Sequence, residues 1–276
     1  MICEKYLFED PAVAPVPADS LGLVVNSHGS TIYGRILLPG VSDPAERTPV
    51  VLMMHGYPGI ERNADISPAL QRTGMAVAEF SYRGVWGSHG YYCISHQIED
   101  TETMLAYLRD NAEQYRIDPE RIYLVAHSMG GFTALNVLAR GAKVRGAVIL
   151  APGDIGYYYQ EEPEKMEEIL REQEQGYFTT PYPEYLKEDL AAHAEEWRFI
   201  RLAEKLSVDI PLRFVGATRD TIVPPEDHID PLVEALRRRG ADVDSVRLQD
   251  GHAFSSHRAT LTGMVYRYIE EMDGRQ

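Results

Sequence analysis

The sequence contains few cysteines and no long apolar stretch. Only Cys3 and Cys93 occur among 276 residues, and no CxxC pair is present, so neither a disulfide framework nor a cysteine zinc site is expected. The histidines at 28, 55, 89, 96 and 127 do not have the spacing of metal ligands, and we expect no metal and no cofactor. No run of 18 apolar residues occurs, so no membrane-spanning helix is expected.

Positive charge is also scarce. Lys and Arg number 27 against 42 Asp and Glu, which gives a formal net charge of −15. This balance disfavours nucleic acid, and it equally disfavours anionic membrane surfaces. The first 15 residues lack the basic region, apolar core and cleavage site of a secretory signal, so we expect a cytoplasmic protein.

The 44% apolar fraction is typical of a globular protein, and its pattern alternates between strand-like and helical segments. Because strand–helix units of this length form right-handed crossovers, the pattern predicts an α/β fold: a mostly parallel sheet with helices on both faces. The predicted strands cover 21–26, 31–37, 49–55, 75–82, 122–126, 147–150, 212–216 and 243–248. The predicted helices cover 66–72, 98–111, 131–140, 230–239 and 258–272.

Residues 155–206 have a different composition, rich in Glu and Tyr with helical spacing. Predicted strands of one sheet lie on either side of this segment, so it is expected to be an insertion and not a separate module. The predicted organisation is a core formed by 1–154 and 207–276, with a helical cap over 155–206.

The strongest local motif is AHSMGG at 126–131. It follows an apolar strand and opens a helix, which is the context that a nucleophile elbow requires. Ser128 would project its hydroxyl from this turn, and Gly130 would let strand and helix approach closely. The alternative is a serine helix cap before a glycine packing contact.

The predicted strand 49–55 runs into HGYPG at 55–59. A turn of this kind supplies an oxyanion donor in many enzymes, so the backbone N–H groups of Tyr57 and Met129 are the candidate oxyanion hole. The alternative is an ordinary Gly/Pro turn. His55 is expected to be structural, hydrogen-bonded under the loop.

A candidate acid and a candidate base follow the serine in the sequence. Asp220 lies just after a buried strand, and His252 lies in the loop after the next strand, where it could act as general base for Ser128. His257 and Asp250 are the rival base and acid. Two further acids near the next helix start, at 227 and 230, are expected to be caps.

Together these segments resemble the α/β-hydrolase superfamily from about residue 21 to residue 272. The resemblance rests on HGYPG at 55–59, FSYRGVWGSHG at 80–90, AHSMGG at 126–131, GATRDTIVPPE at 216–226 and DGHAFSSHR at 250–258. It is strongest to the prolyl-oligopeptidase and acyl-peptidase-like branch and to small bacterial esterases of the cinnamoyl and feruloyl type. Ala126 departs from the usual glycine. The resemblance implies a serine hydrolase with the catalytic set Ser128, Asp220 and His252.

The substrate is indicated only by aromatic side chains. The cap is rich in them, and aromatic rings suit the roof of an apolar pocket, so the candidate substrate contacts are Trp86, Tyr158, Tyr177 and Trp197. We expect hydrolysis of aryl or short-to-medium acyl carboxylic esters. An aminopeptidase or acyl-peptide hydrolase, or a non-catalytic binding protein of the same fold, is the alternative. The expected partner is a small ester or short peptide, and a homodimer is compatible with the sequence.

Overall fold

The apolar segments pair into one eight-stranded sheet in the computed structural model, which describes residues 2–171 and 175–274. The strand order is β1-β2-β4-β3-β5-β6-β7-β8. The pairs β1–β2 and β2–β4 are antiparallel, whereas all other neighbouring strands are parallel. The strands are β1 Asp19–Ser27, β2 Ser30–Leu38, β3 Thr48–Met54, β4 Ala76–Phe80, β5 Ile117–His127, β6 Gly146–Leu150, β7 Leu212–Ala217 and β8 Val243–Leu248.

The helices of the core connect these strands. They are α1 Ile66–Arg72, α2 Ile94–Asp110, α3 Ala112–Tyr115, α4 Met129–Ala139, α9 Pro225–Arg238 and α10 Arg258–Asp273, and a short 3₁₀ helix, η1, covers Glu4–Leu7. Helix α9 begins five residues before its predicted start. Proline is favoured in the first turn of a helix because its missing N–H needs no partner there, and Glu226 and Asp227 complement the helix dipole.

The core lies on both faces of the sheet. On β3, Val50 and Leu52 pack with α2, α4, α8 and α9 on one face, whereas Val51 and Met53 pack with α1 and α10 on the other. The entire strand is buried, because parallel strands covered by helices on both sides are apolar at every position. The predicted fold class, a mostly parallel sheet between helices, is confirmed.

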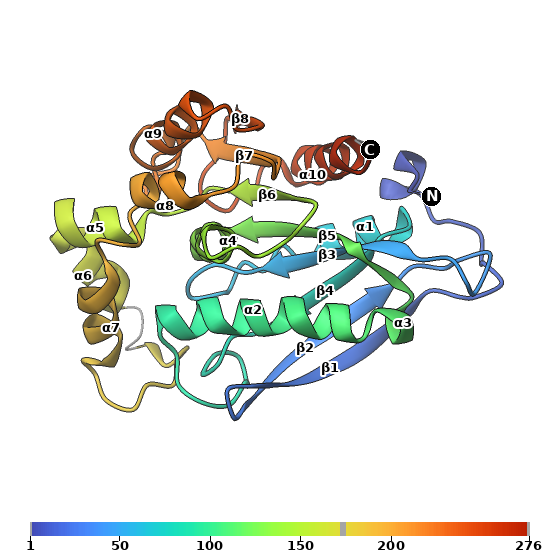
Figure 1. Cartoon of the computed structure of the whole chain (residues 1–276), viewed down its shortest axis with the longest axis horizontal. Helices are drawn as coiled ribbons and strands as arrows, with labels where there is room; N and C mark the ends of the chain where they lie inside the picture. Colours follow the sequence, from blue (N-terminus) through green and yellow to red (C-terminus); the bar gives the residue numbers. More distant parts are fainter. Residues whose placement is uncertain (1, 172–174, 275–276) are drawn as a thin grey trace.

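Helices α5 Ile155–Glu161, α6 Pro163–Arg171, α7 Tyr185–His193 and α8 Phe199–Lys205 lie between β6 and β7 in sequence. Figure 1 shows α5, α6 and α7 beyond the end of the sheet toward which the arrowheads of β5 and β6 point. The two chain ends lie together at the other end of the molecule, where Arg267 pairs with Glu4. No helix within 2–171 or 175–274 is long and apolar enough to cross a membrane.

Candidate active site

Ser128 occupies the turn between β5 and α4. Its backbone has φ 57° and ψ −121°, a conformation that a residue with a side chain seldom adopts. The Ser128 N–H donates to the Leu150 carbonyl of β6 at 2.8 Å, and the Ser128 carbonyl accepts the Phe132 N–H at 3.1 Å, which is the first hydrogen bond of α4. The strained turn is therefore fixed on both sides, and the serine stands at the carboxyl edge of the sheet.

Two glycines make room for this turn. A Cβ on Gly130 would lie 2.4 Å from the Met54 carbonyl oxygen, so α4 can approach β3 only without a side chain there. A Cβ on Gly56 would lie 2.8 Å from the Ser128 Cβ. Gly130, two residues after the serine, is therefore required by a backbone contact, as the motif indicated.

The side chains of Asp220, His252 and Ser128 form a continuous hydrogen-bonded chain. Asp220 Oδ2 lies 2.7 Å from His252 Nδ1, and His252 Nε2 lies 2.8 Å from Ser128 Oγ. The other carboxylate oxygen, Oδ1, accepts the backbone N–H groups of Ile222 at 2.9 Å and Val223 at 2.8 Å. The side chain of Asp220 is fully buried, so its orientation is set by these three bonds.

This geometry determines the tautomer of His252. An ionised carboxylate can only accept hydrogen bonds, so the ring proton must be on Nδ1. In the neutral ring, Nε2 then carries the lone pair and accepts the Ser128 hydroxyl. The arrangement can remove a proton from the serine oxygen, and the buried carboxylate then stabilises the positive charge that forms on the imidazole.

His127, the residue before Ser128, packs against His252. Its Nε2 lies 2.9 Å from the His252 carbonyl oxygen, and the two ring centroids are 5.0 Å apart. Burial lowers the pKa of His127 to about 3. The ring is therefore neutral at ordinary pH, donates through Nε2–H, and places no positive charge beside the base. The role of His127 could not be predicted, because a contact between residues distant in sequence leaves no local pattern.

The rival acid and base pair with each other. His257 Nδ1 lies 3.0 Å from Asp250 Oδ2, and the same oxygen accepts the Ser256 N–H. His257 is the residue before α10. Asp250 Oδ1 accepts the Gly251 N–H, in the loop that carries His252. Asp250 and His257 therefore stabilise the loop that carries His252. The hydrogen bonds that reach Ser128 come from Asp220 and His252.

The loop after β3 brings Tyr57 beside Ser128, and Met129 follows the serine as the first residue of α4; both line one cavity with it. An N–H in the first turn of a helix has no acceptor within that helix, which suits Met129 to an oxyanion. His55 lies beneath the loop with Nδ1 2.8 Å from the Gly56 carbonyl oxygen, and burial lowers its pKa to about 3. The expected structural position of His55 is confirmed.

The cavity at Ser128 has a volume of about 80 Å³ and a mainly apolar wall. Among the residues that the structure describes, the wall includes no carboxylate, ammonium or guanidinium group. Tyr158 belongs to this wall, and its hydroxyl donates to the Ile222 carbonyl, which closes one side. The remaining wall is Tyr57, Met129, Gly153, Ile155, Ile169, Ile222, Val223 and His252.

Three of the candidate substrate contacts lie elsewhere. Trp86 donates from Nε1 to the Pro58 carbonyl at 3.0 Å and packs against Tyr177, with ring centroids 5.6 Å apart. These two residues support the loop of Tyr57 from outside the cavity. Trp197 is 1% exposed and packs edge-on against Phe132, so it joins the segment between β6 and β7 to α4. Counting aromatic residues cannot distinguish such packing from a pocket roof.

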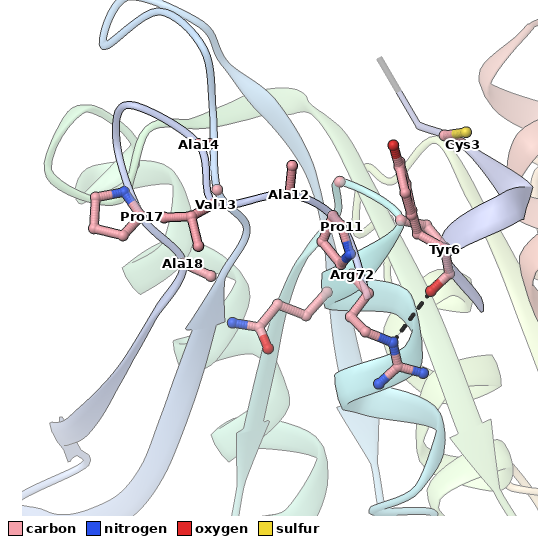
Figure 2. A pocket seen from close by; sticks show the side chains of 13 residues that line it. Cys3, Tyr6, Pro11, Ala12, Val13, Ala14, Pro17, Ala18 and Arg72 are labelled. Carbon is pink, nitrogen blue, oxygen red and sulfur yellow. Dashed lines mark hydrogen bonds between the residues drawn. The ribbon is translucent and has the colours of Figure 1, made fainter. Parts of the chain in front are cut away.

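A larger cavity of about 370 Å³ lies under the N-terminal segment, at the amino ends of the strands (Figure 2). Its polar lining consists of Cys3, Tyr6, Gln71, Arg72 and Thr73, and the rest is mostly Pro, Ala and Gly. The Arg72 guanidinium is bonded to the carbonyls of Tyr6 and Leu7, and Gln71 to those of Asp19 and Leu38. These groups hold the N-terminal segment in place and form no nucleophile–base pair. Within 2–171 and 175–274, no group of three His, Cys, Asp or Glu side chains could hold a metal ion.

Comparison with known proteins agrees with this architecture. A scan against family models matches residues 49–213 to the family described as alpha/beta hydrolase fold, whereas no curated protein matches. Est1E from Butyrivibrio proteoclasticus is 16% identical with a TM-score of 0.67, covering 92% of this chain and 99% of its own. Thermogutta terrifontis esterase 2, phosphoramylated by tabun, is 17% identical with a TM-score of 0.69, covering 96% and 97%.

A longer protein shares the fold as well. An acylaminoacyl peptidase from Pyrococcus horikoshii is 14% identical with a TM-score of 0.66, and the match covers 92% of this chain but 41% of the peptidase. The sheet order and the elements that follow β3, β5, β7 and β8 define an α/β-hydrolase architecture. The family match spans more than half of the residues of this chain, so the chain belongs to the α/β-hydrolase fold family.

Proposed function

We propose that this protein is a serine hydrolase that cleaves carboxylic esters through an acyl-enzyme. The observation that carries the proposal is the chain from Asp220 through His252 to Ser128, with distances of 2.7 and 2.8 Å. Nucleophile, base and orienting acid all lie within hydrogen-bonding reach, which is the geometric signature of an activated serine.

The reaction proceeds in two steps. Ser128 Oγ attacks the acyl carbon while His252 Nε2 takes the hydroxyl proton, and the carbonyl oxygen becomes an oxyanion. The N–H groups of Tyr57 and Met129 stabilise that oxyanion. The intermediate collapses, and the leaving alcohol takes the proton from His252. Water then attacks the acyl-enzyme, again with His252 as base; Ser128 Oγ leaves, takes the proton back from His252, and the carboxylic acid is released.

The cavity favours a short, uncharged acyl group. Its volume of about 80 Å³ is smaller than the roughly 150 Å³ of a cavity that holds benzene, and its wall is mainly apolar. Of the aryl and short-to-medium esters that the sequence suggests, acetyl to butyryl esters fit best. Ferulic acid has been bound to Est1E, which shares this fold, so an aryl ester is the informative comparison.

A peptidase that recognises a free N-terminus would need an anionic group at its pocket. Among the described residues, the cavity wall supplies none. We therefore favour esters over peptides with a free N-terminus.

The test is a panel of p-nitrophenyl acetate, butyrate and octanoate, methyl ferulate, and aminoacyl p-nitroanilides, with Ser128→Ala as the control. We expect the highest kcat/KM for acetate or butyrate and at least a 10³-fold loss in the variant. Turnover of the anilides at rates that rival the esters would favour the peptidase. Turnover of no substrate, or turnover that survives Ser128→Ala, would overturn the proposal.

A further inference from the structure

Three aromatic rings next to the proposed oxyanion site form a cluster that the mechanism above does not use. Phe178 stacks on Tyr57 with centroids 4.6 Å apart and an interplanar angle of 17°. It also packs on Tyr92, with centroids 4.5 Å apart, and Tyr92 is 2% exposed. The Tyr57 ring is therefore contacted by a residue of the segment between β6 and β7, far from it in sequence. We call Tyr57, Tyr92 and Phe178 the three-ring cluster.

The backbone around Phe178 is fixed by hydrogen bonds. Phe178 pairs with Val85 in an antiparallel bridge, the Thr179 N–H donates to the Gly84 carbonyl at 2.8 Å, and the Tyr92 N–H donates to the Thr179 carbonyl at 2.8 Å. A Cβ on Gly84 would lie 2.9 Å from the Thr179 oxygen, so this close approach needs glycine. Phe178 is thus presented to Tyr57 by a short strand-like pairing.

The same cluster is linked to the other proposed oxyanion residue, Met129. Tyr92 donates its hydroxyl to Gln97 Oε1 at 2.8 Å, and Gln97 Nε2 donates to Thr133 Oγ1 at 2.6 Å and to the Met129 carbonyl at 3.4 Å. Gln97 is 1% exposed, and Thr133 is fully buried. Thr133 also donates to the Met129 carbonyl at 2.9 Å. A buried polar path therefore runs from the rings to the first turn of α4.

We propose that Phe178 and Gln97 are positioning residues that hold the backbone amides of Tyr57 and Met129 toward the oxyanion. The inference rests on the proposed function. If Phe178 has this role, the oxyanion site also depends on the correct packing of the segment that carries Phe178. Because oxyanion donors act mainly in the transition state, a loss of their alignment lowers kcat and leaves KM nearly unchanged.

The test compares Phe178→Ala and Phe178→Leu with the wild-type enzyme on p-nitrophenyl acetate. Phe178→Tyr is the conservative variant, because it keeps the stacking ring. The matched control is Tyr182→Ala, which removes a 43% exposed aromatic residue of the same segment that contacts Tyr185 and lies outside the cluster. We expect kcat to fall at least tenfold in Phe178→Ala and Phe178→Leu with KM within twofold, near-wild-type kcat in Phe178→Tyr, and no change in Tyr182→Ala.

A second measurement separates positioning from loss of fold. Inhibition by a boronic acid, which mimics the tetrahedral intermediate, should weaken in step with kcat/KM, and inhibition by acetate should not change. An unchanged kcat, a rise in KM alone, or a loss of activity that matches a loss of folded protein in thermal melts would overturn the inference. If the wild-type enzyme hydrolyses no ester, the proposed function fails instead, so the two failures are distinguishable.

Discussion

At the scale of single residues, the site depends as much on missing side chains as on reactive ones. Ser128 can adopt its positive φ because Gly56 and Gly130 leave space for the turn. The atoms that surround Gly130 are the backbone oxygens of Met54 and His55, and these cannot move aside as the end of a flexible side chain could.

Gly130→Ala tests this constraint. A methyl group there would force α4 away from β3, and we expect a loss of about 1–3 kcal/mol in the free energy of unfolding. The measurement is urea unfolding followed by circular dichroism. Gly22→Ala is the matched control, because a Cβ on Gly22 meets nothing within 4 Å. Equal stability of the two variants would show that the close approach is not needed.

At the scale of elements, each candidate group follows a parallel strand at its carboxyl end. Tyr57 follows β3, Ser128 follows β5, Asp220 follows β7 and His252 follows β8. Such ends meet at one edge of a parallel sheet, which brings residues distant in sequence together. Helix α6 then contributes Ile169 to the wall of the cavity at Ser128.

Ile169→Ala should lengthen the acyl chain that the enzyme accepts. Removing the branched side chain enlarges a cavity of about 80 Å³, so the ratio of kcat/KM for p-nitrophenyl octanoate to that for acetate should rise about tenfold. Ile200→Ala in α8, at a position 43% exposed, is the matched control and should leave the ratio unchanged. The same ratio in both variants would show that Ile169 does not limit the length of the acyl chain.

The positions of Ser128, Asp220 and His252 could be predicted because each lies in a local pattern of strand and turn. The structure brings the three together, and their catalytic role stays a prediction. The contacts of His127, Gln97 and Phe178 could not be predicted, since each joins segments far apart in sequence and depends on side-chain packing.

The same limit explains why the packing of Trp197 could not be predicted. Its burial against Phe132 arises from how the segment between β6 and β7 docks on α4. Strand and helix types were predictable because apolar periodicity is local. The five-residue error at the start of α9 arose because proline usually marks a break between elements, whereas here Pro224 is the N-cap and Pro225 the first residue of the helix.

At the scale of the whole molecule, three buried histidines make stability depend on pH. Burial is the largest cause that lowers the pKa values of His55, His127 and His228 to about 3, from an ordinary value of 6.5. The unfolded chain therefore binds protons that the folded chain excludes. The stabilisation is complete above pH 6.5 and is lost as the pH falls toward 3. Asp154 acts in the opposite sense, because burial raises its pKa to about 6.

His228→Asn tests this linkage. His228 Nδ1 accepts the Asp154 N–H at 3.1 Å, and an asparagine oxygen can take the same role without titrating. The free energy of unfolding, measured by urea titration at pH 7.5, 5.5 and 4.5, should fall less steeply in the variant below pH 6.5, by up to about 1.4 kcal/mol per pH unit. His28→Asn, at an exposed turn, is the control. Identical slopes for His228→Asn and the wild type would contradict the assignment.

The proposed function requires that Ser128 is a nucleophile activated by His252. Its most direct test is intact-protein and peptide mass spectrometry after treatment with a fluorophosphonate probe. We expect one adduct, located on Ser128, absent in Ser128→Ala and formed at least 10³-fold more slowly in His252→Ala. No adduct on the folded wild-type protein, or an adduct that persists in Ser128→Ala, would contradict the claim.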